Sequence, residues 1–177
     1  MSSFDYLTKS QVEQLIKTAK NNRWGLRDGL IILISFRHGL RACELVSIEW
    51  DWINLNEGEL HIRRAKNGEG GHHFLQGDEM RLLRRLQREQ TSNSRFVFIG
   101  ERGDPLTARA FGQIIKRTGN KLGWNISPHI LRHSCGYHLA NQGLDTRLIQ
   151  DYLGHKNINS TVNYTRTNKQ RFKQIKW

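Results

Sequence analysis

Two stretches near the C-terminus, SPHILRHSCGYHLA (127–140) and YLGHKNINSTVNY (152–164), gather side chains that handle protons and anions. A metal centre would need carboxylates or thiolates at ligand spacing, and a protease would need a serine or cysteine beside its base. The stretches instead offer imidazoles, a guanidinium and a phenol with few acids, so they favour chemistry around a phosphate. The candidate residues are His129, Arg132, His133, His155 and Tyr164.

His129 and Arg132 lie three residues apart in the first turn of an expected helix, so they share one face. A helix N-terminus attracts anions, and a guanidinium donates two hydrogen bonds to one phosphate. The alternative is a helix start with a surface arginine and a core histidine. His133 follows His129 at the spacing of a zinc pair, but the glutamate of H-E-x-x-H is missing. We therefore expect His133 to support the site by packing or hydrogen bonding.

Three further candidates stand in the first half of the chain. Arg41, in HGLRACEL, begins a short expected helix, where it is either a second anion-binding group or a solvated arginine at a turn. Glu44 lies three residues on and can orient Arg41 through an ion pair. Lys66 precedes the turn of an expected hairpin. Its ammonium carries a proton that a general acid can transfer, whereas the alternative is a loop lysine that only adds solubility.

His155 follows an expected helix stop at Gly154, and Tyr164 comes nine residues after His155. A tyrosine hydroxyl becomes a useful nucleophile when cations surround its target and a base takes its proton. The alternative for Tyr164 is a half-buried aromatic side chain, which is also what we expect of Tyr152.

Hydrophobic periodicity and capping residues predict a mainly helical chain that positions these groups. One segment changes period: Leu60 and Ile62 alternate with His61 and Arg63, and a turn at 67–71 leads to a returning strand at 72–76. A further strand is expected at 52–56, and a short strand or extended link at 95–100. The class is therefore α+β, with a small antiparallel sheet inserted near the N-terminal third. Expected helices are 8–20, 26–39, 41–48, 79–89 capped by Asp78, 108–123 capped by Thr107, 129–142 after Ser127-Pro128, 146–153 capped by Asp145, and 168–176.

The amino-acid composition indicates which class of molecule the chain binds. The 177 residues include 28 Lys+Arg against 16 Asp+Glu, a formal charge of +12 that favours nucleic acid. A basic protein with no specific ligand is the alternative. Cys43 and Cys135 match no metal-ligand spacing, which favours reduced thiols in a cytosol. No stretch approaches the roughly 20 apolar residues of a membrane span, and the N-terminus shows no signal-peptide pattern.

HGLRACEL, the hairpin lysine, HILRH, YLGH and the tyrosine nine residues beyond resemble the tyrosine recombinase (phage integrase-like) catalytic domain, over residues 7–167. Longer stretches, such as LNEGELHIRRAKNG, are similar to the compact recombinases that invert fimbrial promoter switches. The resemblance implies a catalytic set of Arg41, Lys66, His129, Arg132, His155 and Tyr164, with Glu44 and His133 in support.

The family's activity implies DNA cleavage and rejoining through a 3′-phosphotyrosyl intermediate, with no metal ion or other cofactor. Double-stranded DNA with inverted-repeat sites is the implied partner, bound by a homotetramer that is mainly monomeric when free, in the bacterial cytoplasm with the nucleoid. We expect one catalytic domain over 1–177, no separate N-terminal DNA-binding domain, and a tail at 168–177 that docks on a neighbouring protomer. The alternatives are an integrase of a mobile element, a non-catalytic DNA-binding accessory protein and an RNA-binding protein.

Overall fold

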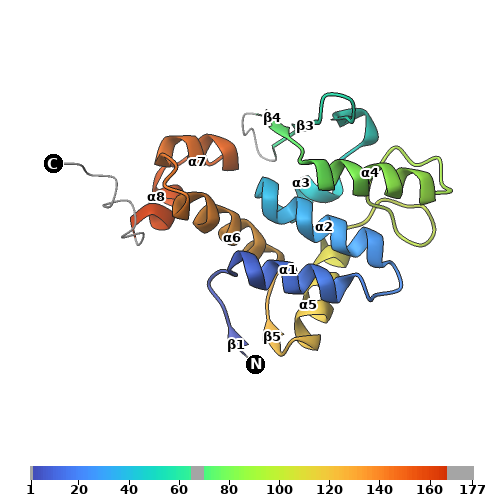
Figure 1. The fold of residues 1–177 in the computed structure, drawn as a ribbon, viewed down its shortest axis with the longest axis horizontal. Coiled ribbons are helices and arrows are strands. Elements are labelled where there is room, and N and C mark those ends of the chain that lie inside the picture. The colour runs from blue at the N-terminus through green and yellow to red at the C-terminus, as the bar shows by residue number, and fades with distance from the viewer. Residues whose placement is uncertain (1, 65–69, 167–177) are drawn as a thin grey trace.

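The computed structural model describes residues 2–64 and 70–166, and their arrangement confirms the predicted α+β class (Figure 1). The described helices are α1 (Lys9–Ala19), α2 (Gly25–His38), α3 (Ala42–Val46), the 3₁₀ helix η1 (Trp50–Trp52), α4 (Gly77–Glu89), α5 (Ala108–Lys121), α6 (Pro128–Asn141), α7 (Thr146–Leu153) and α8 (Asn159–Arg166). The described strands are β1 (Ser2–Ser3), β2 (Ile53–Asn54), β3 (Glu59–Ile62), β4 (Gly71–Phe74) and β5 (Trp124–Asn125). The expected helix at 168–176 lies outside the described residues.

The expected hairpin is confirmed as β3 and β4, which pair antiparallel with Leu60 opposite His73. β2 adds a third strand on the other side of β3, with Ile53 opposite Leu60, in the region where a further strand was predicted. The even-numbered residues Leu60 and Ile62 are buried, as the alternation requires. The chain at 95–100 forms isolated bridges only, so it is an extended link.

A second, two-stranded sheet was not predicted. β1 pairs in parallel with β5, with Ser2 opposite Trp124 and Ser3 opposite Asn125. Each strand is too short to show any periodicity in the sequence. The pairing places the N-terminal residues beside the segment that leads into α6.

Helix α2 forms the centre of the core, and α1, α4 and α6 pack around it (Figure 1). The run LIILISF lies within the helix predicted at 26–39, and its residues Leu30, Ile31, Ile32 and Ile34 are buried. Gly39 ends α2 with a φ of 57°, a left-handed conformation that glycine adopts without strain. This turn carries the chain directly to Arg41 at the start of α3.

Most predicted helix starts are confirmed. Thr8, Thr107 and Asp145 each accept a hydrogen bond from a backbone N–H of the first turn, and Pro128 opens α6 after Ser127. The predicted cap at Asp78 is wrong, because α4 begins at Gly77 with Gln76 in the capping position. Asp78 lies in the first turn, and its carboxylate is 2.6 Å from Arg37 Nη1. The competing ion pair across to α2 explains the different use of this side chain.

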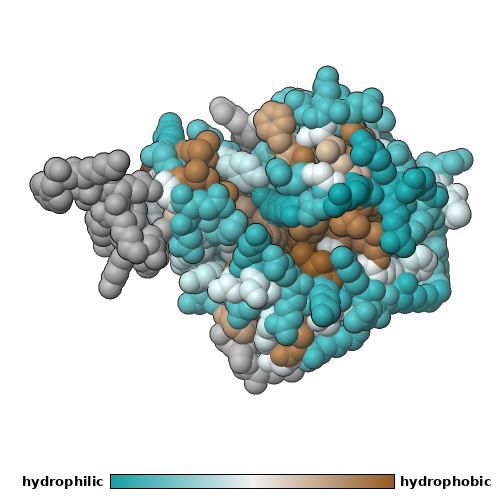
Figure 2. All heavy atoms as spheres, in the orientation of Figure 1, coloured by the Kyte–Doolittle hydropathy of each residue, from teal (hydrophilic) through white to brown (hydrophobic). Residues whose placement is uncertain are grey.

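Hydrophilic side chains cover most of the face shown in Figure 2, and hydrophobic side chains show between them. This surface agrees with a chain whose formal charge is +12. Among the residues that the structure describes, no helix has the length and apolar character needed to cross a membrane.

Candidate active site

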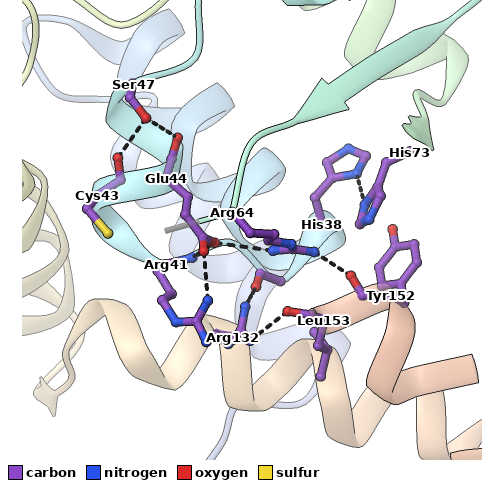
Figure 3. A network of polar contacts seen from close by, with 11 residues as sticks. His38, Arg41, Cys43, Glu44, Ser47, Arg64, His73, Arg132, Tyr152 and Leu153 are labelled. Carbon is purple, nitrogen blue, oxygen red and sulfur yellow. Dashed lines mark hydrogen bonds and ion pairs between the residues drawn. The ribbon is translucent and has the colours of Figure 1, made fainter. Parts of the chain in front are cut away.

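Arg41 and Glu44 form the ion pair that their spacing predicted. Arg41 Nη1 lies 2.7 Å from Glu44 Oε1, and the backbone N–H of Arg41 donates to Glu44 Oε2 at 2.9 Å. The Glu44 side chain is only 1 % exposed, whereas that of Arg41 is 35 % exposed. A buried carboxylate therefore holds a guanidinium that still reaches solvent (Figure 3).

Arg132 comes from the second turn of α6 and is buried. Its guanidinium donates to the backbone oxygen of Gly39, and Nη2 donates to the backbone oxygen of Leu153 at 2.7 Å. Burial lowers the pKa of Arg132 to about 10, and the charges of Arg41 and Arg64 act in the same direction. Arg132 thus stays charged at neutral pH, and these two bonds use two of its five N–H groups.

Arg64 joins this site through the same Glu44 carboxylate, and the sequence reasoning missed it. Its side chain is 2 % exposed; Nη1 lies 3.2 Å from Glu44 Oε2, and Nη2 donates to the backbone oxygen of Tyr152. Burial lowers the pKa of Arg64, and the charge of Glu44 opposes this shift. The signal was present, because Arg64 continues the even-numbered, buried face of Leu60 and Ile62 beyond β3.

Three guanidiniums and one carboxylate therefore converge between α3, the end of β3, α6 and the end of α7 (Figure 3). We call Arg41, Glu44, Arg64 and Arg132 the arginine cluster. Its net charge of about +2 in a largely buried setting makes it a site for an anion with several oxygens, such as a phosphate.

Tyr164 projects from α8 onto α6 and is 4 % exposed. Its hydroxyl lies 2.9 Å from His133 Nδ1. Its ring covers Gly136, where an added Cβ would come within 2.5 Å of the ring. Burial raises the pKa of Tyr164, and the positive charge of Arg132 opposes this shift. The hydroxyl is therefore protonated at neutral pH and needs a base to become a nucleophile.

The histidine that contacts Tyr164 is His133, the residue expected to support the site. Burial lowers its pKa, with His129 and Arg132 acting in the same direction. A neutral His133 can accept a proton at Nδ1 from the tyrosine hydroxyl. His129, one turn earlier on α6, is exposed to solvent.

His155 follows Gly154, which ends α7 with a φ of 63°. Its Nδ1 lies 2.8 Å from Thr161 Oγ1, and its ring centroid is 6.2 Å from that of Tyr164. Burial lowers the pKa of His155 to about 4, with Arg132 the next contributor, so this imidazole is neutral at pH 7. We call His133, His155 and Tyr164 the tyrosine–histidine group. Lys66 lies outside the described residues.

A second set of buried polar residues lies beside the arginine cluster and was not predicted (Figure 3). His38 Nδ1 is 3.1 Å from His73 Nδ1, and the His73 ring stacks on Tyr152 with centroids 4.0 Å apart. His38 Nε2 also lies 3.3 Å from Glu79 Oε1. Burial lowers the pKa of His73 to about 3. These residues hold β4, α2 and α7 together beside the cluster.

The described residues contain no group of three or more histidine, cysteine or carboxylate side chains placed to hold a metal ion. Cys135 is buried, which raises the pKa of its thiol to about 12, and Cys43 is exposed. The chemistry that the described side chains offer is therefore anion binding by guanidiniums beside a tyrosine and two neutral imidazoles.

Comparison with solved structures defines the class of fold. The crystal structure of the XerH site-specific recombinase bound to its difH substrate, in a pre-cleavage complex, matches with a TM-score of 0.80. The match covers 97 % of this chain and 53 % of that chain at 22 % sequence identity. The fold is therefore that of a tyrosine recombinase catalytic domain.

Sequence comparison then gives the family. The Phage integrase family model matches residues 5–171. Type 1 fimbriae regulatory protein FimE of Escherichia coli K12 is 41 % identical over 179 residues, covering 97 % of this chain and 90 % of FimE. Tyrosine recombinase XerA of Pyrococcus horikoshii is 32 % identical over 163 residues, covering 90 % of this chain and 56 % of XerA. The chain belongs to the phage integrase family, and it is a tyrosine recombinase.

Proposed function

We propose that the protein is a site-specific recombinase that inverts a DNA segment carrying a promoter of fimbrial genes. Its similarity to a type 1 fimbriae regulatory protein over nearly the whole of both chains supports this choice. An integrase of a mobile element would use the same chemistry on different sites. Sequencing the DNA beside the gene distinguishes the two, because inversion requires inverted repeats that flank a promoter.

The observation that best supports this chemistry is that α6 contributes residues to both the arginine cluster and the tyrosine–histidine group. Arg132 on α6 belongs to the arginine cluster, and His133, the next residue, contacts the hydroxyl of Tyr164. In the proposed reaction Tyr164 attacks the scissile phosphate, forming a 3′-phosphotyrosyl bond while the bond to the 5′-oxygen breaks. The bond that forms keeps the energy of the bond that breaks, so rejoining needs no nucleotide cofactor.

Each side chain then has a role in that step. Arg41 and Arg132 bind the non-bridging oxygens, where charge builds in the transition state. His133 accepts the proton of Tyr164, although the resemblance placed His129 in the catalytic set and His133 only in support. Lys66 donates a proton to the leaving 5′-oxygen, and His155 donates a hydrogen bond to the phosphate. Glu44 fixes Arg41 and is not itself in contact with DNA in this scheme.

Replacement of Tyr164 by phenylalanine tests the function directly. Tyr164→Phe keeps the ring that packs on Gly136 and removes only the nucleophilic oxygen. We expect normal DNA binding in a gel shift and no covalent protein–DNA adduct on a nicked suicide substrate. Adduct formation by the phenylalanine variant would show that another residue is the nucleophile.

We also propose that residues 1–177 act as one catalytic unit that forms a tetramer on two synapsed DNA sites. Residues 168–177 are the proposed exchanged segment, since Phe172, Ile175 and Trp177 offer apolar groups to a partner surface. Deleting 168–177 should spare binding to DNA with one site and remove cooperative binding to DNA with two. Unchanged cooperativity in a gel-shift titration would exclude this role.

A further inference from the structure

Arg64 differs from Arg132 because it binds the Glu44 carboxylate as well as a backbone oxygen, and it differs from Arg41 because its side chain is only 2 % exposed. Nη1 faces Glu44, and Nη2 donates to the backbone oxygen of Tyr152. The side chain of Arg41, by contrast, is 35 % exposed. A phosphate that arrives from solvent therefore meets Arg41 before it can reach Arg64.

At one end Arg64 fixes the carboxylate that orients Arg41. Glu44 Oε1 lies 2.7 Å from Arg41 Nη1, and Glu44 Oε2 lies 3.2 Å from Arg64 Nη1. Glu44 Oε2 already accepts a hydrogen bond from the backbone N–H of Arg41, and the Arg64 guanidinium adds a charged partner that restricts the broad terminal torsion of the glutamate further. Arg64 thereby restricts the position of the Arg41 guanidinium through the Glu44 carboxylate.

At the other end Arg64 holds the last turn of α7. Arg64 binds the backbone oxygen of Tyr152, and Arg132 binds that of Leu153, the next residue. Such C-terminal carbonyls have no partner within the helix and carry partial negative charge, so two adjacent guanidiniums satisfy them. At Gly154 a Cβ would lie 2.7 Å from Arg64 Nε, so Arg64 also packs on the turn that leads to His155.

We propose that Arg64 is a positioning residue that sets the separation between the phosphate-binding guanidiniums of Arg41 and Arg132. It connects Glu44, which holds the Arg41 guanidinium, to the last turn of α7, which holds the Arg132 guanidinium. Preorganised donors stabilise a transition state only when they are correctly placed, and a displacement of about 1 Å can cost about 10²-fold in rate. The inference rests on the proposed function, because it concerns the cleavage of a phosphodiester.

The test measures single-turnover formation of the covalent adduct at saturating protein. Arg64→Met is expected to slow cleavage by about 10²-fold while DNA affinity in a gel shift stays close to that of the wild type. A second substrate carries a methylphosphonate at the scissile position, which removes one negative charge. The defect should be clearly smaller on this neutral substrate, because it depends less on correctly placed guanidiniums. A purely structural defect would be equal on both substrates.

Arg27→Met is a matched control. Arg27 is also a buried arginine, with Nη2 2.7 Å from Asp28 Oδ1 and Nη1 donating to the backbone oxygen of Ile99 at 2.9 Å. Its loss should lower thermal stability and leave both cleavage rates unchanged at a temperature where the variant is folded. If Arg64→Met does not fold, Arg64→Lys keeps the charge and one contact, and the same difference between substrates is expected.

Two results would overturn the inference: a folded Arg64 variant that cleaves at the wild-type rate, or a variant with equal defects on the two substrates. Failure of the proposed function has a different signature, because the wild-type protein itself would then form no Tyr164-dependent adduct.

Discussion

The arginine cluster and the tyrosine–histidine group are held in different ways. Each guanidinium of the cluster is fixed by a carboxylate or by backbone oxygens. In the other group single polar contacts join His133 to Tyr164 and His155 to Thr161. The comparison teaches that the fold itself fixes the charges proposed to bind the phosphate, whereas the groups proposed to move protons are neutral and have few polar partners.

Burial and the charges of the arginine cluster explain both the charged guanidinium of Arg132 and the neutral imidazole of His155. The pKa of Arg132, lowered to about 10, still leaves the guanidinium charged at pH 7. Burial, together with nearby arginine charge, lowers the pKa of His155 to about 4 and keeps that imidazole neutral. One positive cluster thus supplies charge for a phosphate and keeps its histidine neighbours unprotonated.

The largest expected effect comes from removing a fixed charge. Arg132→Ala should slow cleavage by about 10²–10³-fold, because one preorganised donor to the developing charge is lost. Arg132→Lys should recover little, since an ammonium cannot serve the oxygens of Gly39, Leu153 and a phosphate with the same geometry. Single-turnover adduct formation measures both. A lysine variant with a near-normal rate would show that charge alone matters in this cluster.

The next effect tests how firmly Tyr164 is held. Gly136→Ala places a Cβ 2.5 Å from the Tyr164 ring, so α8 must move, and cleavage should slow by up to about 10²-fold. Gly112→Ala in α5 is the matched control, because its nearest neighbouring atom is 3.9 Å away. That change should leave the cleavage rate unaltered and raise the free energy of unfolding by about 0.5–1 kcal/mol. A normal rate for Gly136→Ala would mean that α8 repositions freely.

The pH dependence of cleavage addresses the proton acceptor. The pKa of His133 lies below its ordinary value, so the neutral, proton-accepting form predominates at pH 7. The rate should be flat near neutrality and fall about tenfold per pH unit once the pH drops below that pKa. His133→Asn should be slower and lack this acid limb. An unchanged acid limb in the asparagine variant would assign the limb to another group.

The smallest expected effect is on the pH dependence of the free energy of unfolding, and it concerns His73, which lies beside the arginine cluster. The pKa of His73 is about 3 in the folded protein, against about 6.5 in the unfolded chain. The unfolded chain therefore binds more protons between these values, and the free energy of unfolding falls as the pH drops from about 6.5 toward 3. Urea unfolding at several pH values should show a weaker dependence in His73→Gln. His72→Gln, on the exposed face of β4, should match the wild type.

The sequence predicted the elements better than the contacts between them. Caps such as Thr8 and Asp145 and the glycine stop at Gly39 act within a few residues, so local rules were enough. The Asp78 cap failed because an ion pair to Arg37, distant in sequence, uses that carboxylate. The β1–β5 pairing is a long-range contact between strands too short to show a pattern.

The sequence predicted the candidate site residues and one local pair among them, but not the partners that lie far apart in the chain. Spacing alone suggested the Arg41–Glu44 pair, which lies within one turn of helix. Arg64 binds the backbone oxygen of Tyr152, which lies 88 residues further along the chain. The only indication of its burial in the sequence was its even-numbered position, which continues the buried alternation of Leu60 and Ile62. The choice between His129 and His133 as neighbour of the hydroxyl depends on how α8 docks on α6, which the helical pattern does not specify.

Helix α6 carries both halves of the site, and this imposes a strict angular register. Successive residues of an α-helix are about 100° apart around its axis, so Arg132 and His133 point to different sides. An insertion or deletion before Arg132 would rotate only the start of the helix, with the exposed His129, and would keep Arg132, His133 and Gly136 in register. One residue inserted between His133 and Gly136 would instead turn the surface that packs under Tyr164 away from His133. Such an insertion should abolish cleavage even if it is fully helical, so the spacing from Arg132 to Gly136 is as constrained as the identity of these residues.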